Sequence, residues 1–339
     1  MKSRLDNSDS SLRKGHILDQ KYSIKKVLGI GGFGRTYLAE SIWTQENFAI
    51  KEYFPNDWAV RSEDGISLRA FDETKRSFYE HGLSVFVNEA KILKNLREDD
   101  VVVDVKDFFY ENNTGYIVME YIDGINFRQF AKSSGGVLQS YILFELLKDV
   151  IKALNTVHKA GVIHRDISPD NIMLNDKFKA KLIDFGAAKH SGAGQETSIF
   201  LKHGYAPIEQ YDRNGNQGPW TDVYSLCATM YYLLTGIKLQ KAYERVAEDK
   251  TIPLNMFNIE IEDYQANAIL KGLNVQIEDR YQSMAELYYD LYHEYLPGER
   301  PQKPAAEAVR QKTMPEIMPI PDITREEAAM QYLKQHSED

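Results

Sequence analysis

The 339-residue sequence lacks several features that define whole classes of protein. Its single cysteine, Cys227, excludes an intramolecular disulfide and a cysteine-rich zinc site. No stretch approaches the ~18 consecutive apolar residues that span a bilayer. The N-terminus lacks the apolar core of a signal peptide, and Lys2 stands where myristoylation requires glycine. We therefore expect a cytoplasmic protein with no membrane segment in this sequence.

The charge balance excludes a further class. The chain has 41 lysine and arginine residues against 50 aspartate and glutamate residues, a net charge of -9. General binding to nucleic acid needs a basic surface, so no nucleic-acid partner is expected. Hydrophobic residues make up 43% and charged residues 27%, which is typical of a globular protein with room for about two domains.

The pattern of the first 120 residues predicts a sheet with one main helix. Residues 1–19 are polar and serine-rich at their start, which indicates a flexible arm. Apolar residues at near-helical spacing predict a helix over 83–96. The expected strands lie at Tyr22–Leu28, Thr36–Ala39, Phe48–Ile50, Val101–Val103, Phe108–Tyr110 and Tyr116–Met119.

The remainder of the chain is predicted to be mainly helical. The expected helices are Leu138–Lys159, Thr221–Thr235, Ile261–Leu273 and Met284–Tyr295. Residues 297–339 differ in composition, because six of the chain's 11 prolines lie between 297 and 322. We expect a proline-rich tail there, with a short helix from Thr324 to about Gln335.

A glycine-rich run follows the first expected strand: Gly29, Ile30, Gly31, Gly32, Phe33 and Gly34. In a dinucleotide-binding site a helix should open within such a run, but the next residues are strand-like. The pattern favours a glycine-rich hairpin whose backbone amides approach phosphates closely. A nucleotide-binding dehydrogenase is the disfavoured alternative.

Lys51 ends an apolar strand downstream of the glycine run and could neutralise phosphates. It needs an acidic partner, and Glu89 on the expected helix is the candidate. The two are separated by 37 residues, which include Glu52–Pro55 and a turn at Asp64–Gly65. We expect this interval to be an ordered extension with contacts of its own.

A loop after the first long helix has the strongest chemical pattern. Within the run Val162–Asn171, Asp166 can accept a proton from a hydroxyl and Asn171 can coordinate a metal. Asp184, 18 residues after Asp166, supplies a hard oxygen ligand that suits magnesium. The predicted metal ligands are therefore Asn171 and Asp184.

These motifs, in this order, resemble the catalytic domain of the eukaryotic-like protein kinases over about residues 20–296. Gly204–Glu209 resembles the A-P-E segment of that family, with Arg280 in the position that pairs with Glu209. The local sequence around these motifs is most similar to that of bacterial serine/threonine kinases. The implied fold is α+β and bilobal: a small lobe over 20–121 with an antiparallel sheet and one main helix, and a larger, mainly helical lobe over 122–296.

The resemblance implies a cofactor and a substrate class. ATP would lie between the lobes with Mg²⁺, which Mn²⁺ can replace, and proteins would be phosphorylated on serine or threonine. It also implies that His164 is structural. The residues implied around the nucleotide, besides the glycine run and Lys51, are Leu28, Ala49, Met119, Glu120, Ile122, Asn126 and Met173.

Two features concern regulation and rate. Ser168 stands where serine/threonine kinases usually have a lysine, and Lys202 is the candidate replacement cation. Arg165 is of the type that binds a phosphate on the activation segment, so we expect autophosphorylation at Thr197 or Ser198. A cognate phosphatase or regulatory partner would then be expected.

Two alternatives stay open at this point. A pseudokinase scaffold is favoured by Ser168 and disfavoured by the presence of Lys51, Glu89, Asp166, Asn171 and Asp184. A small-molecule phosphotransferase of related fold is disfavoured by the full-length segment 186–209 and by Arg280.

Overall fold

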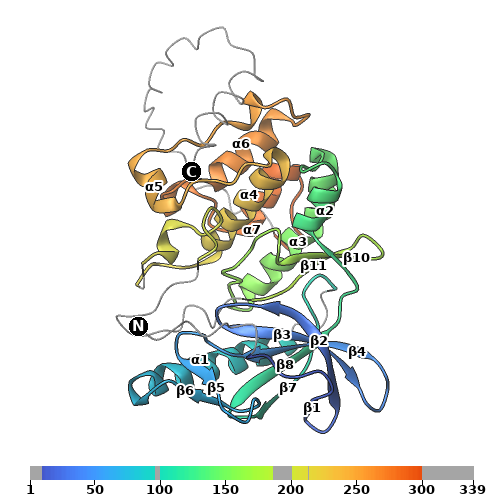
Figure 1. Cartoon of the computed structure of the whole chain (residues 1–339). Helices are drawn as coiled ribbons and strands as arrows, with labels where there is room; N and C mark the ends of the chain where they lie inside the picture. Colours follow the sequence, from blue (N-terminus) through green and yellow to red (C-terminus); the bar gives the residue numbers. More distant parts are fainter. Residues whose placement is uncertain (1–9, 96–99, 186–200, 213, 300–339) are drawn as a thin grey trace.

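A computed structural model describes residues 10–95, 100–185, 201–212 and 214–299. Figure 1 shows two lobes, with the sheet-rich N-terminal lobe below the helical C-terminal lobe. The bilobal α+β fold expected from the sequence is thereby confirmed.

The N-terminal lobe is built on a six-stranded antiparallel sheet with the order β1-β2-β3-β4-β8-β7. Its central strands alternate buried and partly exposed side chains, as β3 does, so one face of the sheet lies against the core. A tight turn joins β7 to β8, with Asn112 and Asn113 at φ 54° and 58°, a conformation that asparagine tolerates. The strands are β1 (Ile17–Leu18), β2 (Tyr22–Ile30), β3 (Gly34–Ser41), β4 (Asn47–Tyr53), β7 (Val105–Glu111) and β8 (Thr114–Glu120).

The interval between Lys51 and Glu89 is an ordered extension, as the sequence predicts. After β4 the chain forms a two-stranded hairpin of β5 (Ala59–Arg61) and β6 (Leu68–Ala70) and then enters α1 (Glu73–Lys94). The predicted start of this helix at residue 83 is wrong by ten residues. The helix begins earlier because the Asp72 side chain accepts a hydrogen bond from the Lys75 amide and so caps it.

The C-terminal lobe packs its helices around α4 (Pro219–Thr235), which is buried nearly all round. Gly236, at φ 73°, ends this helix in the left-handed conformation that favours glycine. The other helices are α2 (Phe127–Ser133), α3 (Ser140–Lys159), α5 (Ala242–Ala247), α6 (Asp263–Gly272) and α7 (Met284–Tyr292), with 3₁₀ turns at Ile208–Gln210, Leu254–Met256 and Ile277–Asp279.

A small sheet lies where the two lobes meet. Its strand order is β11-β10-β9, formed by β9 (Gly124–Asn126), β10 (Ile172–Asn175) and β11 (Ala180–Leu182). The expected strand at Val101–Val103 is not formed. Val102 instead makes a single parallel bridge to Leu182, because the chain there runs alongside β11 rather than joining the large sheet.

The N-terminal segment also differs from the expectation. Residues 10–19 pack on the sheet instead of forming a flexible arm: Leu12 is buried with Tyr22 and Tyr37, and β1 pairs with β2. The apolar residues Leu12 and Leu18 within the polar stretch explain the difference. The expected helix at 324–335 and most of the proline-rich tail lie outside the described residues.

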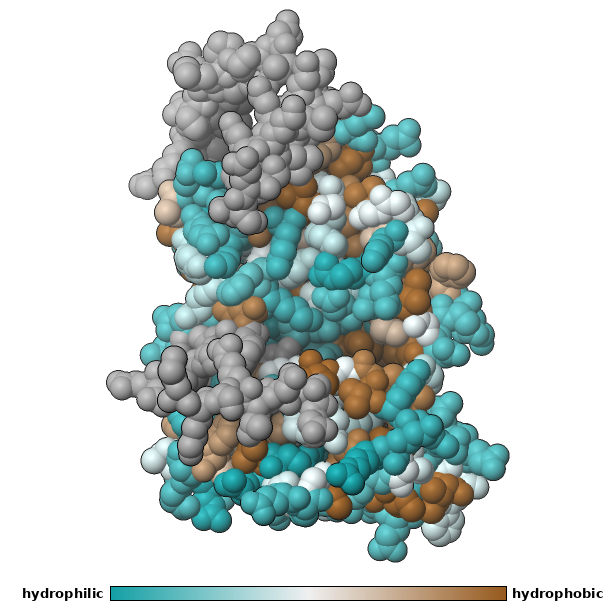
Figure 2. All heavy atoms as spheres, in the orientation of Figure 1, coloured by the Kyte–Doolittle hydropathy of each residue, from teal (hydrophilic) through white to brown (hydrophobic). Residues whose placement is uncertain are grey.

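One face of the molecule carries little concentrated apolar area. The face seen in Figure 2 is mostly hydrophilic, with apolar groups in small scattered patches. Among the described residues, no helix is long and apolar enough to cross a membrane.

Candidate active site

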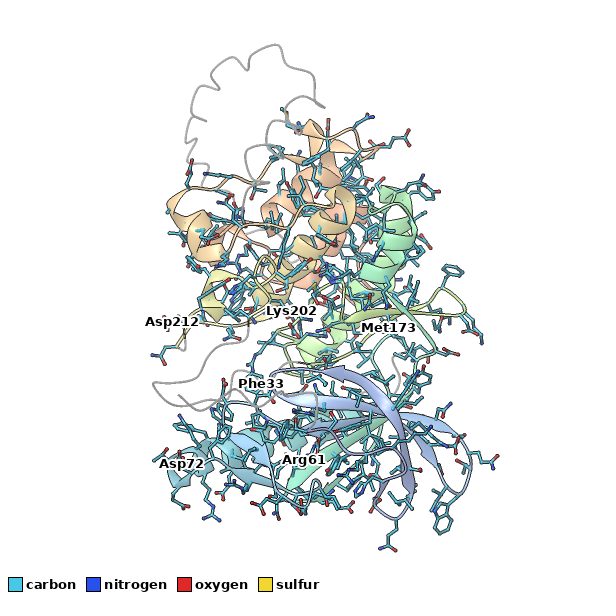
Figure 3. The ribbon with its side chains drawn as sticks, in the orientation of Figure 1. Phe33, Arg61, Asp72, Met173, Lys202 and Asp212 are labelled. Atoms are coloured by element: carbon cyan, nitrogen blue, oxygen red, sulfur yellow. The ribbon has the colours of Figure 1, made fainter. Side chains whose placement is uncertain are left out.

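A cavity of about 420 Å³ lies between the glycine-rich loop and the C-terminal lobe. Figure 3 shows Phe33 of that loop and Lys202 of the C-terminal lobe on facing sides of the gap between the lobes. The cavity brings together predicted residues from five separate segments of the chain. It is lined by Gly29–Gly34, Thr36, Lys51, Phe86, Asp166, Asp184, Phe185, Leu201 and Lys202.

The glycine-rich loop joins β2 to β3 and needs its glycines for a local reason. A Cβ atom on Gly34 would lie 2.6 Å from the carbonyl oxygen of Glu52, so a side chain there would push β3 away from β4. The Gly31 amide donates to the Gly34 carbonyl at 2.8 Å, which closes the hairpin. The predicted hairpin, with no helix opening inside the run, is confirmed.

Lys51 has a different direct partner from the predicted one. Its Nζ lies 2.6 Å from Oδ1 of Asp184, and no ion pair within the described segments joins it to Glu89. Burial alone would lower the pKa of the Lys51 ammonium, but the carboxylates of Asp184 and Glu89 outweigh burial and raise it. Asp184 reaches Lys51 from a left-handed backbone conformation, φ 66°, which a non-glycine residue adopts at a cost.

Asp222, at the start of α4, holds the loop Val162–Asn171 through the backbone of that loop, which we call the catalytic loop. Its carboxylate accepts hydrogen bonds from the amides of His164 at 2.7 Å and Arg165 at 2.8 Å. It also contacts Nε2 of His158 at 2.8 Å. Burial alone would raise the pKa of Asp222, but the hydrogen bond from His158 and the amide bonds lower it. The loop is therefore fixed from inside the C-terminal lobe.

His164 is fully buried and serves the loop structurally. Its Nδ1 accepts a hydrogen bond from the Asp166 amide at 3.3 Å, so Nε2 carries the proton and donates it to the Ile183 carbonyl at 3.1 Å. Burial lowers the pKa of His164, which keeps the ring in this neutral form. The ring also packs on Phe185, with centroids 4.4 Å apart.

Asp166 and Asn171 are joined directly. The Asn171 Nδ2 donates to the Asp166 carbonyl at 2.7 Å and to its Oδ2 at 2.8 Å. Both bonds use the amide nitrogen, so Oδ1 of Asn171 faces away from Asp166 as an acceptor. This oxygen and the Asp184 carboxylate are hard oxygen donors of the type that Mg²⁺ prefers, so the chemistry of the two side chains fits such an ion.

Lys202 lies beside Asp166, as the sequence hypothesis requires. Its Nζ donates to Oγ of Ser168 at 2.9 Å and lies 3.5 Å from Oδ2 of Asp166. Ser168, which stands in place of the usual lysine, thus contacts Lys202 directly. Both Asp166 and Lys202 line the cavity.

Glu209 and Arg280 form the pair that the resemblance implied. The guanidinium contacts both carboxylate oxygens, at 2.9 and 3.0 Å, and both side chains are buried. Thr221 on α4 donates a further hydrogen bond to Glu209. The Glu209–Arg280 ion pair ties the segment after residue 200 to the core of the C-terminal lobe.

The residues expected around an adenine ring do not line the described cavity, apart from the glycine run. They are nevertheless brought together in pairs across strands: Ala49 opposes Met119, and Met173 opposes Asn126. The Glu120 amide donates to the Asp104 carbonyl, so Glu120 has only its carbonyl left for a ligand. Leu28 is 41% exposed at the end of β2, and Ile122 is partly exposed.

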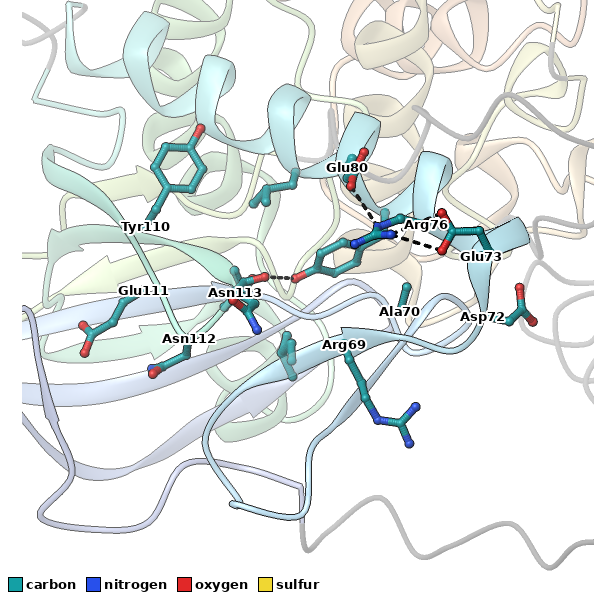
Figure 4. A pocket seen from close by; sticks show the side chains of 14 residues that line it. Arg69, Ala70, Asp72, Glu73, Arg76, Glu80, Tyr110, Glu111, Asn112 and Asn113 are labelled. Carbon is teal, nitrogen blue, oxygen red and sulfur yellow. Dashed lines mark hydrogen bonds and ion pairs between the residues drawn. The ribbon is translucent and has the colours of Figure 1, made fainter.

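A larger surface cavity, about 830 Å³, lies elsewhere in the N-terminal lobe, between α1, the β5–β6 hairpin and the β7–β8 turn. Figure 4 shows its polar rim, where Arg76 is bound by Glu73 and Glu80. Tyr79 donates to the Asn113 carbonyl at 2.7 Å. None of the predicted catalytic residues lines it.

Sequence reasoning missed two positions that the site depends on. Asp222 lies within the expected helix Thr221–Thr235 and has no predicted role, although an acid in an otherwise apolar helix signals a buried polar contact. Asn56 in the extension also has no predicted role, and it binds the glycine-rich loop. Thr197 and Ser198 lie outside the described residues.

The comparison with known families agrees with this geometry. The model of the family described as "Protein kinase domain" matches residues 22–312. The chain belongs to the protein kinase family. The curated relatives of this kinase domain include serine/threonine-protein kinase PknB of Mycobacterium leprae, 30% identical over 301 residues, which are 85% of this chain and 45% of the relative. Serine/threonine-protein kinase F of Synechocystis sp. is 32% identical over 253 residues, which are 69% of this chain and 48% of the relative.

A solved structure is also similar. The structure titled "PpkA-294 apo form" is 32% identical and has a TM-score of 0.74, covering 83% of this chain and 99% of that one. The kinase domain spans about half the length of the curated relatives that it matches.

Proposed function

We propose that this kinase domain transfers the γ-phosphate of ATP to serine and threonine hydroxyls of proteins, including its own. One observation carries the proposal: Lys51, Asp166 and Asp184 meet in one cavity beneath a glycine-rich loop. Phosphoryl transfer needs mainly positioning and charge neutralisation, and these groups supply both. The relatives named as serine/threonine kinases support this acceptor class.

Asp166 is the group that would accept the proton of the attacking hydroxyl. Its Oδ2 is oriented by the Asn171 amide at 2.8 Å, and its backbone by His164. Lys202 lies 3.5 Å from the same oxygen, where its charge would stabilise the phosphoryl group in transfer. Lys202 therefore replaces the cation that Ser168 cannot supply.

Asn171 and Asp184 would hold Mg²⁺, or Mn²⁺ in its place. The bound ion would neutralise charge on the phosphate oxygens. Asp184 now pairs with Lys51, so metal binding at Asp184 would leave Lys51 to Glu89 and to the phosphates. The influence of Glu89 on the pKa of Lys51 supports this exchange.

The nucleotide base would lie toward the small sheet between the lobes. Leu28, Ala49 and Met173 would contact the ring, Met119 would lie behind it, and the carbonyl of Glu120 and the amide of Ile122 would bind its edge. Asn126 would reach the ribose, since it lies on β9 opposite Met173 of β10.

Autophosphorylation at Thr197 or Ser198 would regulate the kinase domain. The Nε of Arg165 is buried with no hydrogen-bond partner among the described residues, and a phosphate could supply one. A cognate phosphatase or regulatory partner would reverse or control that modification.

The decisive experiment is transfer of labelled phosphate from ATP and Mg²⁺ to a mixture of proteins and small alcohols, with Asp184→Ala as the control. We expect label on protein serine and threonine and on the chain itself. Binding of ATP without transfer would favour a pseudokinase, and label on the small acceptors alone would favour a small-molecule phosphotransferase. Label on residues 187–203 would support the regulatory part.

A further inference from the structure

The glycine-rich loop is bound along its length by the segment that follows β4. The Phe54 amide donates to the Phe33 carbonyl at 3.0 Å, and the Asn56 amide donates to the Gly32 carbonyl at 2.8 Å. The side chain of Asn56 adds a third bond, from Nδ2 to the Gly31 carbonyl at 3.2 Å. Three consecutive carbonyls of the loop are thus bound by two residues of the extension.

The Asn56 side chain is oriented from its other end. Its Oδ1 accepts a hydrogen bond from Nη1 of Arg35 at 3.4 Å. A guanidinium can only donate, so the oxygen of the amide must face Arg35 and the nitrogen must face the loop. Arg35 is fully buried, and its guanidinium lies over the Phe54 ring at 3.6 Å from the centroid. Asn56 therefore has one orientation, which makes it a donor to Gly31.

Apolar packing holds the same junction. The Phe33 ring at the loop tip meets the ring of Trp58 edge-on, with centroids 5.7 Å apart. Phe33 and Trp58 are 7% and 2% exposed. Arg35 also donates to Ser10 Oγ at 2.5 Å, which ties the N-terminal segment to this junction.

We propose that Asn56 is a positioning residue that holds the glycine-rich loop ready to receive nucleotide phosphates. The proposal rests on the proposed function, because it concerns the same cavity, which Gly29–Gly34 line beside Lys51 and Asp184. A loop that is already ordered loses little conformational freedom when phosphates bind. Without the side-chain amide of Asn56, the loop occupies the competent conformation for only a fraction of the time. The apparent affinity for nucleotide phosphates then falls by that fraction.

The consequence is specific to the phosphates. Asn56 binds the tip of the loop, at Gly31 and Gly32, whereas the adenine would lie toward β9 and β10. Loss of the Asn56 side-chain amide should therefore weaken binding of ATP and ADP and leave adenosine binding unchanged. A general disturbance of the N-terminal lobe would weaken all three.

The test compares Asn56→Ala with the wild type by calorimetry for ATP, ADP and adenosine, and by kinetics. We expect the Kd and KM for ATP to rise about tenfold, equivalent to about 1.4 kcal/mol, with kcat changed less than about threefold. Asn56→Asp keeps the oxygen toward Arg35 but removes the donor, so it should lose at least as much. Asn47→Ala, on an exposed side chain at the other end of β4, is the matched control and should change nothing.

Equal weakening for adenosine and ATP, or unchanged ATP affinity in Asn56→Ala, would overturn the proposal. Should the variants not fold, hydrogen exchange in the wild type decides. The amides of Phe54 and Asn56 should be protected without nucleotide, and rapid exchange at both would overturn the proposal as well. A wild type that binds no ATP would instead contradict the proposed function, so the two failures are distinguishable.

Discussion

The two lobes fix their parts of the active site by different means. In the C-terminal lobe, the buried Asp222 of α4 binds two successive backbone amides of the catalytic loop, and Asn171 fixes Asp166 from within that loop. In the N-terminal lobe, hydrogen bonds from the extension after β4 hold the glycine-rich loop, and Lys51 on β4 contacts Asp184 of the other lobe. The C-terminal groups are therefore set by the core of one lobe, whereas the N-terminal groups are set by contacts that can be altered separately.

The largest effect is expected when a charged group of the active site is removed from either lobe. Asp166→Ala, Asp184→Ala and Lys51→Met should each reduce phosphoryl transfer by about a thousandfold or more, because each removes a different charge from one transition state. Transfer of labelled phosphate measures the rate, and thermal unfolding shows that the fold persists. Near-normal transfer by the Asp184 variant would contradict the assigned roles.

The next effect tests the anchor in the C-terminal lobe. Asp222→Ala leaves the His164 and Arg165 amides buried without an acceptor, which should cost roughly 3 kcal/mol of unfolding free energy. Because the same amides position Asp166, kcat should also fall by more than tenfold in the folded fraction. Urea unfolding and kinetics measure the two effects. Asp222→Asn, which keeps one acceptor oxygen, should lie between, and a stable, fully active Asp222→Ala would separate α4 from catalysis.

The N-terminal lobe also contains a buried carboxylate, Glu52, which pairs with Arg61 and has no predicted catalytic role. Glu52 is fully buried and accepts hydrogen bonds from Arg61 at 2.7 and 2.6 Å and from the hydroxyls of Tyr37 and Tyr116. Arg61→Met should cost about 3 kcal/mol, because it leaves a buried carboxylate without its cation.

At saturating ATP, however, Arg61→Met should keep kcat within about threefold of the wild type. Adding Glu52→Gln should restore part of the stability, which urea unfolding of the single and double variants measures. A large loss of kcat in Arg61→Met would mean that the two lobes do not differ in this way.

A smaller effect concerns the replacement cation. Lys202→Ala should lower kcat by about 10- to 100-fold and raise the KM for ATP little, because the ammonium beside Asp166 would act mainly on the transition state under the proposed mechanism. The double variant Ser168→Lys with Lys202→Thr should recover part of the rate. Steady-state kinetics on a protein substrate measures both, and a wild-type rate for Lys202→Ala would leave Ser168 without this explanation.

The smallest effect is a pH dependence in the catalytic loop. Burial lowers the pKa of His164 in the folded state, so below about pH 6.5 the unfolded chain takes up a proton before the folded one does. This contribution to stability is present above that pH and is lost as the pH falls, by at most about 1.4 kcal/mol per unit.

NMR of the His164 ring, assigned with a His164→Gln variant, should show a neutral Nε2–H form at pH 6.5. A ring that titrates at or above pH 6.5 would contradict the lowered pKa. A neutral ring protonated on Nδ1 would contradict the tautomer inferred from its hydrogen bonds.

The sequence by itself determined the order of the chemical groups and most of the regular elements. The glycine run, Lys51, Asp166, Asn171 and Asp184 were recognisable because their types and spacing carry the chemistry. Helix ends were predictable where one residue decides them, as Gly236 does for α4. The start of α1 and the burial of residues 10–19 were not, because a cap at Asp72 and two apolar side chains outweighed the local pattern.

Only the tertiary structure decided which of these groups touch. Lys51 meets Asp184 rather than Glu89, Lys202 reaches Ser168 across 34 positions of sequence, and Asn56 holds a loop that precedes it by 25 positions. The physical reason is that each contact depends on how separate elements pack, and hydrogen bonds with an optimum near 3 Å are made or lost by shifts that leave the sequence pattern unchanged.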